Sequence, residues 1–442
     1  MKKINLILLS GGSGKRLWPL SNGVRSKQFL KLLKSPDGKY ESMVQRVMRQ
    51  INEAGLDATI TIATSVSQAD SIKSQLGNTV EVVTEPDRRD TFPAIALAPS
   101  YLLTEKNAKA DDIVVVLPID QYTEISYFKT VAKMADAVES NVANLVLMGI
   151  CPTEPSSKYG YIIPAEKDKE IMQVSRFTEK PTEDKAKELL QLGALWNGGV
   201  FAFKLGYIKN IVEKYSAIES FSQVRNNYCA FPKISFDYEV VEKENSIAVV
   251  PFSGQWKDLG TWNALVEETD ASIGKVVVDE NVKNTNVINE LDIPVVCMGL
   301  EDVVVAASHD GIFVGKKASS EKLKSYIDNI EMRPMFEERR WGEYTVLNIN
   351  EYPDGKKSLT KLLKFNDGHG ISYQRHKKRS EVWTVVSGTG LLTLDDVVSE
   401  VKQGDVILIK EYQKHAIKSV ENLQIVEVQL GTELTEEDIE RF

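Results

Sequence analysis

The sequence predicts an α/β domain with a mostly parallel sheet, then a small β connector, then a compact β-barrel or sandwich. Short β-branched runs alternate with amphipathic stretches from residue 4 to about residue 265. Between about 270 and 330 the pattern changes to short aliphatic runs separated by turn residues. From residue 341 to about 430, period-two alternation and regular Gly or Asp turns follow. These three patterns set the expected order of the domains.

The first domain is predicted from its apolar runs. Strands are expected at residues 4–9, 59–64, 79–83, 112–118 and 144–149, and helical spacing at 43–51, 91–105 and 126–140. Helices on both faces of such a sheet leave ligands to bind beyond the carboxyl ends of its strands. In the connector, a helix is expected at about 319–330, and the charged stretch 335–341 is interpreted as a junction.

Composition excludes several classes of protein. The 442-residue chain has a net charge of −9 with both signs interspersed, which argues against binding to nucleic acid or to an anionic membrane. The longest apolar run near the N-terminus is far shorter than the roughly 20 residues of a membrane span. Three widely spaced cysteines, Cys151, Cys229 and Cys297, favour buried free thiols in a reducing compartment. We therefore expect a cytoplasmic protein.

The glycine-rich stretch LILLSGGSGKRLWPLSNGVRSKQFL, residues 6–30, follows the first strand. It is not a P-loop, because Arg16 stands where Ser or Thr would follow the Gly-Lys pair, and it is not a dinucleotide fingerprint, because Leu17 replaces a glycine. Small residues followed by Lys15, Arg16 and Lys27 would suit a phosphate group approached by backbone amides. An ordinary tight turn with solvated cations is the alternative.

Further motifs occur in order along the chain. They are EPDRRDT (85–91), LPIDQ (117–121), KYGYI (158–162), FTEKP (177–181), LWNGGVFAF (195–203), SFDYEVVEK (235–243) and WKDLGTW (256–262). With the glycine stretch, they resemble the sugar-nucleotide pyrophosphorylases, and among these the bifunctional mannose-1-phosphate guanylyltransferases that carry a C-terminal mannose-6-phosphate isomerase domain. Lys15 departs from the Thr that is usual there.

The resemblance implies a fold and a domain division. We expect a Rossmann-like nucleotidyltransferase domain with a mixed, mainly parallel sheet at residues 1–265. A β-helix-like connector at 266–335 and a cupin β-barrel at 336–442 would follow. The implied reaction joins GTP and mannose 1-phosphate into GDP-mannose and releases pyrophosphate. A homodimer is also implied.

Such chemistry calls for cations and a metal, because two anions must meet at the α-phosphorus. Arg16 and Lys27 are the expected catalytic cations. Asp120, after a hydrophobic strand, and Asp258, in a loop after residues 246–251, would converge at the sheet edge and hold Mg²⁺. Strand-end turn aspartates are the alternative.

Two groups of binding residues come from the resemblance. The nucleotide-binding residues would be Leu9, Gly11, Gly12, Ser13, Gly14, Lys15 and Arg89. The sugar-phosphate residues would be Gly160, Glu179, Lys180 and Asn197, whose carboxylate, amide and ammonium groups suit hydroxyls and phosphate. A turn that opens a helix is the alternative for the EKP residues.

Residues 340–442 resemble the isomerase half of these enzymes. Its divalent metal, commonly Zn²⁺, would be held by Gln374, His376, Glu381 and His415. However, Lys377 and Lys378 replace histidines, and an ammonium group cannot ligate a cation. We therefore expect a structural or dimerising domain.

Three alternatives to the guanylyltransferase remain open. The chain could be a bifunctional enzyme that also interconverts mannose 6-phosphate and fructose 6-phosphate. It could be a pyrophosphorylase for another pair of NTP and sugar 1-phosphate, since the loop itself does not decide the base. It could also be a non-catalytic sugar-nucleotide sensor that uses the same pocket.

Overall fold

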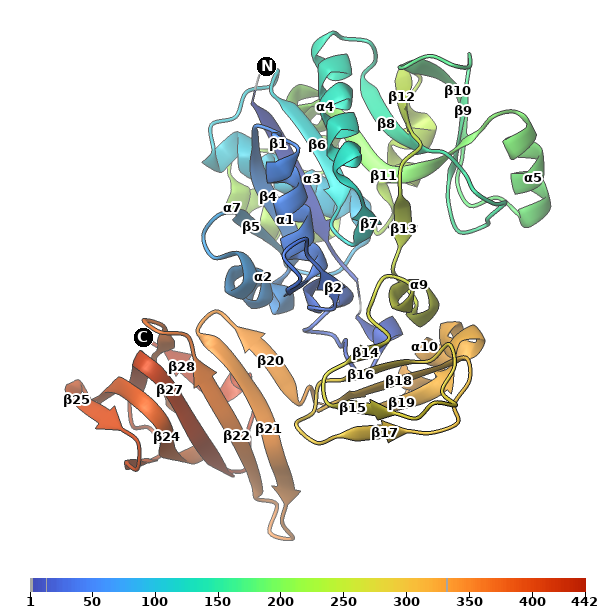
Figure 1. The fold of residues 1–442 in the computed structure, drawn as a ribbon. Helices are drawn as coiled ribbons and strands as arrows, with labels where there is room; N and C mark the ends of the chain where they lie inside the picture. The colour runs from blue at the N-terminus through green and yellow to red at the C-terminus, as the bar shows by residue number, and fades with distance from the viewer. Residues whose placement is uncertain (1–2, 13, 331–332) are drawn as a thin grey trace. The chain divides into compact units, whose positions relative to one another are not determined.

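The computed structural model describes residues 3–12, 14–330 and 333–442, which form two compact units (Figure 1). The described parts of residues 1–12, 27–69 and 76–269 make the first unit, and those of 13–26, 70–75 and 270–442 make the second. Residues 14–26, here named the loop segment, thus belong with the C-terminal part of the chain. None of the helices in the described ranges combines the length and apolarity that a membrane crossing demands.

A nine-stranded sheet forms the centre of the first unit. Its strands are β1 (Ile4–Ser10), β4 (Ala58–Ser65), β5 (Glu81–Glu85), β6 (Ile113–Pro118), β8 (Leu145–Ile150), β9 (Tyr161–Pro164), β10 (Met172–Thr178), β11 (Leu195–Lys204) and β12 (Ile247–Phe252). The strand order is β5-β4-β1-β6-β11-β8-β12-β10-β9. Strands β1, β4, β5 and β6 pair in parallel, whereas β11 is antiparallel to both of its neighbours. The mixed sheet confirms the predicted fold class.

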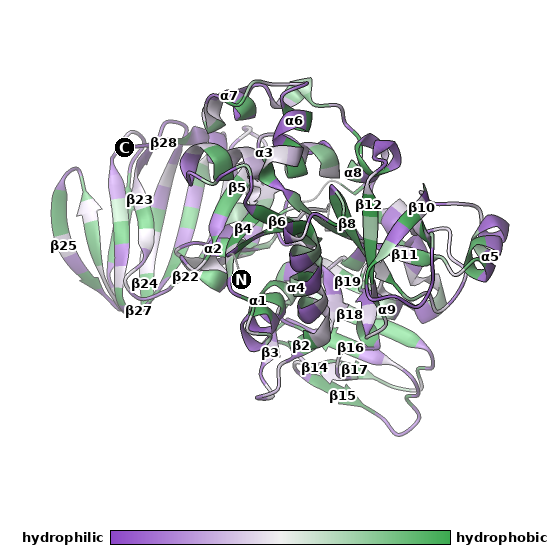
Figure 2. Cartoon of the chain, turned by 90° about the horizontal axis from the view of Figure 1, so that it is seen from above, coloured by the Kyte–Doolittle hydropathy of each residue, from purple (hydrophilic) through white to green (hydrophobic). Residues whose placement is uncertain are grey.

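Helices cover this sheet. They include α3 (Thr91–Glu105), α4 (Ile125–Glu139) and α6 (Leu205–Val212), which contact its strands. The same unit also holds α1 (Met43–Glu53), α5 (Glu183–Gln191), α7 (Phe221–Asn226), α8 (Phe236–Glu239) and α9 (Trp262–Val266), whereas most of α2 (Ala69–Leu76) belongs to the second unit. The Ser42 side chain and Gln45 form a capping box that starts α1. Apolar colour marks the central strands in Figure 2, and residues of α3 pack with these strands in the core. Short pairs β2 (Leu33–Lys34) with β3 (Tyr40–Glu41), and β7 (Gln121–Thr123) with β13 (Trp256–Asp258), lie outside the sheet.

The connector is built from stacked short strands. They are β14 (Ser272–Ile273), β15 (Val276–Val278), β16 (Asn286–Asn289), β17 (Val295–Cys297), β18 (Val303–Ser308) and β19 (Gly311–Lys316). Parallel pairing of β14 with β16, β16 with β18 and β15 with β17 gives the expected β-helix-like coils. The helix expected at 319–330 is shorter: a 3₁₀ stretch, Lys317–Lys322, precedes α10 (Leu323–Ile327). Ser320 bonds the Lys317 carbonyl through its hydroxyl, which competes with regular helix formation.

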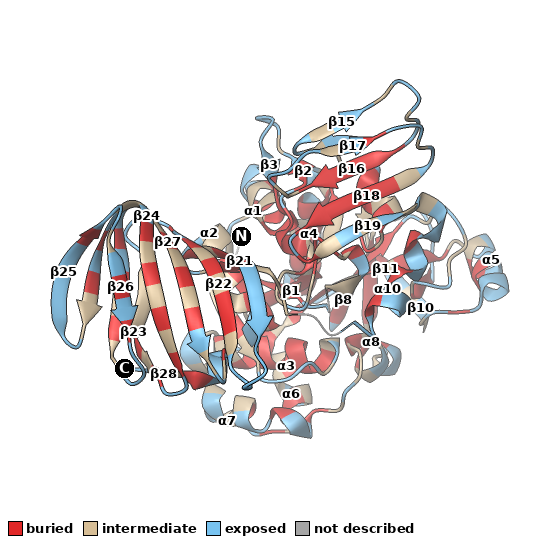
Figure 3. Ribbon diagram, turned by 90° about the horizontal axis from the view of Figure 1, so that it is seen from below, coloured by how far each residue is buried: buried red, intermediate tan, exposed pale blue. Residues whose placement is uncertain are grey.

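The C-terminal sheet curls into a cupin-like half-barrel. Its strands are β20 (Phe336–Arg339), β21 (Gly342–Glu351), β22 (Lys357–Phe365), β23 (Gly370–His376), β24 (Arg379–Leu394), β25 (Val397–Lys402), β26 (Val406–Ile409), β27 (His415–Gly431) and β28 (Ile439–Arg441). Buried and less buried residues alternate along β22, β24 and β27, as a one-sided core requires (Figure 3).

Two expectations from the sequence are corrected. The charged stretch 335–341 is no simple junction, because β20 within it pairs antiparallel with β21 through Phe336 and Thr345. Its charges mislead because Glu337 and Glu338 are buried in this edge strand, where Glu337 pairs with Arg339 and Glu338 accepts a hydrogen bond from Gln75. The three cysteines are free, but only Cys297 is buried, whereas Cys151 and Cys229 are exposed. Both exposed thiols lie outside the strands and α-helices, where surface location is the rule.

Candidate functional site

The carboxyl ends of β1 and β6 bring the glycines and the first aspartate to one edge of the sheet. The two strands are parallel neighbours with Leu9 opposite Pro118. Gly11 and Gly12 follow β1 and are exposed, and Gly12 has a φ of +119°, a conformation that side chains disfavour. Asp120 follows β6. The predicted ligand edge therefore exists in the first unit.

Lys27 joins the two predicted metal-binding aspartates. Its Nζ lies 3.0 Å from Asp120 Oδ2 and 2.8 Å from Asp258 Oδ1. The lysine side chain is only 19% exposed. Three residues that the sequence separates widely thus form one cluster, here named the Lys27 cluster.

Local structure explains how the Lys27 cluster assembles. Asp258 ends β13 instead of lying in the expected loop, and it is opposite Gln121 in the ladder with β7. Gln121 follows Asp120 directly, so this pairing brings the two carboxylates together. Lys27 begins a 3₁₀ turn, Lys27–Phe29, and the buried Gln28 after it donates to Ser10 Oγ at 3.0 Å. That bond ties the lysine to the end of β1.

Electrostatics keep Lys27 charged. Burial would lower its pKa, but the charges of Asp120 and Asp258 raise the pKa above the ordinary lysine value. The ammonium group already occupies the place of a cation between two carboxylates. Carboxylate oxygens are ligands that divalent hard cations prefer, so the two aspartates fit a divalent metal that would share or take over this position.

A second polar group lies in the same unit as the Lys27 cluster. The backbone N–H of Asn197 on β11 donates to the Gly160 carbonyl at 2.8 Å, which holds the two segments together. The Glu179 side chain is only 5% exposed, pairs with Lys180 at 2.8 Å through Oε1, and finds no described partner for Oε2. An unpaired buried carboxylate oxygen is costly unless a ligand supplies a donor. The four predicted sugar residues therefore converge, with Lys180 itself mostly exposed.

Asp237 belongs to this polar group, although it is absent from the predicted site. Its Oδ1 accepts a 2.6 Å hydrogen bond from Asn197 Nδ2. Burial, and next the charge of Glu179, raise the pKa of Asp237 to about 6, against the pull of Asn197 and Lys180. The signal was present in the sequence, because Asp237 lies within the SFDYEVVEK motif. Only the fold shows that this aspartate faces Asn197.

The raised pKa of Asp237 predicts a pH dependence of stability. Folding favours the protonated carboxyl, so its stabilising contribution is complete below about pH 4 and is lost as the pH rises through about 6. The amide side chain in the Asp237→Asn variant does not titrate, so we expect the variant to become more stable relative to wild type as the pH rises from about 4 to about 7. The expected change in the difference of unfolding free energy is about 2 kcal/mol, which is less than the full linkage value because the residue is partly exposed. Denaturant unfolding of both proteins at several pH values measures this difference. A difference that is constant with pH contradicts the assignment.

The remaining predicted nucleotide residues divide between the two units. Arg16 and Lys15 lie in the loop segment, in a 3₁₀ turn, Lys15–Leu17; Arg16 is exposed, and Lys15 pairs with Asp328 at 3.3 Å. Gly14 has a φ of +67°, and a Cβ there would overlap the Asn22 carbonyl. Arg89 donates to the Phe231 carbonyl at 3.2 Å, so part of its guanidinium is already used. Ser13 lies outside the described residues.

A separate cluster lies in the cupin half-barrel. His376, Glu381 and His415 are buried, and their candidate ligand atoms all lie within 4.8 Å of one another. Gln374 is opposite His415 in the β23–β27 pairing, which places the fourth predicted residue on the same pair of strands. Lys377 and Lys378, which replace family histidines, are exposed and pair with Glu440 and Glu433. The replacement of family histidines by Lys377 and Lys378 therefore changes none of the four predicted metal ligands.

Unpaired atoms show that this cluster suits a metal. His415 Nδ1 donates to the Gln413 carbonyl at 3.0 Å, so Nε2 carries a lone pair, and Nε2 has no hydrogen-bond partner in the described chain. Burial lowers the pKa of His415, which keeps the ring neutral. Burial would raise the pKa of Glu381, but His376, Arg379 and His415 together lower it. A neutral imidazole and an ionised carboxylate are the forms that ligate a divalent metal.

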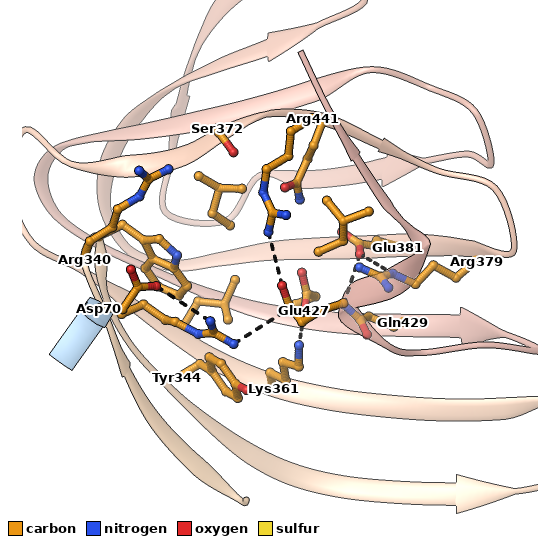
Figure 4. Close-up of a pocket in the computed structure, with 17 residues that line it drawn as sticks. Asp70, Arg340, Tyr344, Lys361, Ser372, Arg379, Glu381, Glu427, Gln429 and Arg441 are labelled. Carbon is orange, nitrogen blue, oxygen red and sulfur yellow. Dashed lines mark hydrogen bonds and ion pairs between the residues drawn. The ribbon is translucent and has the colours of Figure 1, made fainter. Parts of the chain in front are cut away.

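A cavity of about 360 Å³ opens beside Glu381 and Gln374 (Figure 4). Five cationic side chains line it, namely Arg339, Arg340, Lys361, Arg379 and Arg441. Arg340 is exposed and makes no ion pair with any other residue in the described ranges, whereas Lys361 lies 3.6 Å from Glu427. Burial, and next the charge of Glu381, raise the pKa of Glu427 to about 7. The cavity thus combines two of the four predicted metal ligands, Gln374 and Glu381, with an available cation.

Two parts of the chain match the sequence models of known protein families. Residues 5–273 match the model of the family described as Nucleotidyl transferase. The chain belongs to the nucleotidyl transferase family. Residues 331–442 match a second model, Mannose-6-phosphate isomerase C-terminal. The two matches cover the first unit's site and the cupin cluster respectively.

Relatives of this nucleotidyl transferase share both halves. A mannose-1-phosphate guanylyltransferase of Salmonella montevideo is 31% identical over 99% of this chain and 98% of its own length. One from Escherichia coli K12 is 28% identical over 100% and 98%. A solved structure, mannose-1-phosphate geranyltransferase from Thermus thermophilus, is 28% identical with a TM-score of 0.61 and covers 75% of this chain and all of its own. The resemblance inferred from the motifs is thereby confirmed.

Proposed function

We propose that this nucleotidyl transferase makes GDP-mannose and pyrophosphate from GTP and mannose 1-phosphate. The observation that carries the proposal is the Lys27 cluster, in which Lys27 joins Asp120 and Asp258 at the ligand edge of the sheet. The relatives that match along the whole chain are named mannose-1-phosphate guanylyltransferase, which supports this choice of substrates.

The transfer needs positioning and charge more than a strong base. A phosphate oxygen of the sugar 1-phosphate forms the new bond to the α-phosphorus, and the bond from that phosphorus to the β-bridging oxygen breaks, so pyrophosphate leaves with the electron pair. The nucleophile is already an anion. The protein therefore has to hold two anions in line and offset the negative charge that gathers at the phosphorus.

Lys27 supplies the fixed charge for this step. Its raised pKa keeps the ammonium group protonated over the physiological range, so it can contact the α-phosphate and the approaching sugar phosphate. Arg16 offers a planar fork for the other phosphate oxygens. Mg²⁺, held by Asp120 and Asp258, would neutralise charge on the phosphate oxygens. These roles make Arg16, Lys27, Asp120 and Asp258 the proposed catalytic residues.

Nucleotide recognition is proposed for backbone groups at the end of β1. Leu9, Gly11 and Gly12 would contact the base edge, while the amide of Gly14 and the Lys15 side chain would approach the phosphates. The Arg89 side chain is anchored to the Phe231 carbonyl, so its guanidinium could contribute only through its remaining donors. Guanine selectivity rests on the relatives' names alone.

Gly160→Ala tests the proposed sugar pocket. A Cβ at this position would overlap Glu179 Oε2 and lie 2.9 Å from Phe177 Cζ, so the carboxylate must move. We expect the KM for mannose 1-phosphate to rise about tenfold or more, since a hydrogen bond to a charged group is worth roughly 1.5–3 kcal/mol. The KM for GTP should change little. Equal effects on both substrates would argue against a sugar pocket here.

Pyrophosphate release with a matrix of nucleotides and sugar 1-phosphates tests the whole proposal. Purified protein with Mg²⁺ is expected to be most active with GTP and mannose 1-phosphate. If another pair is clearly better, the proposed substrates are wrong. If no pair is turned over although GDP-mannose binds, the protein is a sensor and not an enzyme.

A second activity is favoured by the cupin cluster. We propose that the C-terminal domain interconverts mannose 6-phosphate and fructose 6-phosphate with a divalent metal, commonly Zn²⁺, on Gln374, His376, Glu381 and His415. The unpaired Nε2 of His415 and the cation-lined cavity support this activity over a purely structural role. Arg340, which is free of ion pairs in the described chain, would contact the sugar phosphate. An isomerase assay on the metal-loaded protein tests it.

The organisation of the chain follows as part of the proposal. We propose three domains, residues 1–265, 266–335 and 336–442, and a homodimer in the cytoplasm. The cupin sheet exposes apolar side chains on β25 and β26, namely Val397, Val398, Val406 and Leu408, which supports self-association. Light scattering of the purified protein tests the dimer, and a monomeric mass at working concentration would exclude it.

A further inference from the structure

The loop segment, residues 14–26, groups with the connector although it follows directly on β1 and its glycines. Leu17, Pro19, Leu20 and Ser21 are buried there. The Ser308 hydroxyl of β18 donates to the Pro19 carbonyl at 2.7 Å, and a Cβ on Gly311 would lie 2.5 Å from the Trp18 ring. The segment that carries Arg16 is therefore packed closely against residues about 290 positions later in the sequence.

Arg25 and Glu290 form the strongest link between the two. The Arg25 guanidinium donates twice to the Glu290 carboxylate, at 2.8 and 3.0 Å, and its carbon lies 5.1 Å from the centroid of the Phe336 ring. The side chains are 12% and 25% exposed. A paired, largely buried arginine is held firmly, whereas the loss of its partner leaves an uncompensated charge.

Asn22 and Asp310 form a second link. Asn22 Oδ1 accepts the backbone N–H groups of Val24 and Arg25, which fixes the turn, and Asn22 Nδ2 donates to Asp310 Oδ2 at 2.7 Å. Asp310 Oδ1 accepts the N–H of Met335 at 2.7 Å. One connector carboxylate therefore fixes both the turn of the loop segment and the start of the C-terminal sheet.

The other end of the loop segment is held loosely. Lys15 and Asp328 pair at 3.3 Å, but both side chains are about 40% exposed, so the pair contributes little. Arg16 makes no ion pair or side-chain hydrogen bond with any residue the structure describes. The segment is thus anchored at residues 19–25 and leaves the arginine beside it available to a ligand.

We propose that Glu290 and Asp310 of the connector are positioning residues for nucleotide transfer. They hold the loop segment, and with it the neighbouring Arg16, in one conformation before the nucleotide binds, which lowers the ordering cost of binding. The inference rests on the proposed transferase activity. It assigns to the connector a part in nucleotide binding that is separate from the Lys27 cluster and from the cupin cluster.

Glu290→Gln in the full-length protein tests the proposal, with Asp292→Asn as the matched control. Asp292 lies two residues away in the same connector, but its fully exposed carboxylate pairs with Lys275 at 3.4 Å and does not contact the loop segment. We expect Glu290→Gln to raise the KM for GTP about tenfold or more while the KM for mannose 1-phosphate stays near wild type. Asp292→Asn should leave both values unchanged. A merely structural role would lower the active fraction, and so the apparent kcat, without this split.

Two further measurements test whether Glu290 acts through the conformation of the loop segment. Trypsin should cleave after Lys15 or Arg16 faster in Glu290→Gln than in Asp292→Asn, whatever the activity. The double variant Arg25→Gln/Glu290→Gln should be no worse than Arg25→Gln alone, because both act through one pair. If Glu290→Gln fails to fold, Asp310→Asn takes its place in both assays.

The outcomes separate this inference from the proposed function. Absence of pyrophosphate release by the wild-type protein refutes the function. An active Glu290→Gln protein whose KM for GTP matches that of Asp292→Asn refutes only the positioning role, even if trypsin cleaves its loop faster.

Discussion

Lys27→Ala is expected to lower kcat for pyrophosphate release by about 10²- to 10³-fold, the usual effect of removing one preorganised charge from a transition state. The lysine is the one cation placed between Asp120 and Asp258 in the described site. The same change leaves two carboxylates without a bridging cation, so we also expect the nucleotide-free variant to bind Mg²⁺ more tightly than wild type. Steady-state kinetics and calorimetric titration with Mg²⁺ measure the two effects.

Lys257→Ala is the matched control for this prediction. Lys257 precedes Asp258 and also bridges two carboxylates, with Nζ 2.9 Å from Glu267 and 2.7 Å from Glu268. Its side chain makes no described ion pair with Asp120 or Asp258, so most of the wild-type turnover should remain. Near-normal turnover of Lys27→Ala, or an equal loss in both variants, would remove the Lys27 cluster from the mechanism.

His376→Ala is expected to release the divalent metal proposed for the cupin domain and to abolish the proposed mannose 6-phosphate isomerisation. His376 Nε2 lies 3.1 Å from Glu381 Oε1, and the buried ring of His415 lies 4.9 Å from that of His376, measured between centroids. Loss of one ligand from a set of four weakens a metal site by several kcal/mol or more, in line with the roughly 10–16 kcal/mol of a complete structural zinc site. Metal analysis and a coupled isomerase assay measure both losses.

His369→Ala is the control for the cupin prediction, because His369 is exposed and its Nδ1 lies 3.1 Å from the Asp367 carbonyl, away from the predicted ligands. It should retain the metal and the isomerase activity. Pyrophosphate release should survive in both variants, since the cupin cluster and the Lys27 cluster belong to different units. If the wild-type protein binds no divalent metal, either as purified or after incubation with metal, the domain has a structural role.

Strand and helix positions follow from local patterns, and many were predictable. The apolar run at residues 4–9 is β1, and the helical spacing at 91–105 is α3, because buried β-branched runs and a capped apolar stretch leave few alternatives. The stretch at 335–341 is predicted to be a junction because its many charged residues are typical of a linker. The structure shows that most of these residues belong to an edge strand. The helix expected near 319–330 was too long, because serine hydroxyls compete for its carbonyl groups.

Site residues were predictable where the family motif contains them. Four of the proposed site residues, Lys27, Asp120, Glu179 and Asn197, lie in the family motifs, and the fold brings Lys27 to Asp120 at the end of β6. Asp237 was missed, because its role depends on a 2.6 Å contact with Asn197 that no spacing reveals. Lys377 and Lys378 replace family histidines, but only the strand geometry shows that both side chains are exposed and pair with Glu440 and Glu433 instead of lying among the four predicted ligands.

The sequence by itself determined the family, the order of the domains and the chemical types that each site contains. Only the tertiary structure decided which of these groups meet: Lys27 with Asp120 and Asp258, His376 with His415, and Arg25 with Glu290. The physical reason is that secondary structure depends on neighbours a few residues apart. A charge cluster depends instead on strand order and pairing register, which bring together residues separated by tens to hundreds of positions.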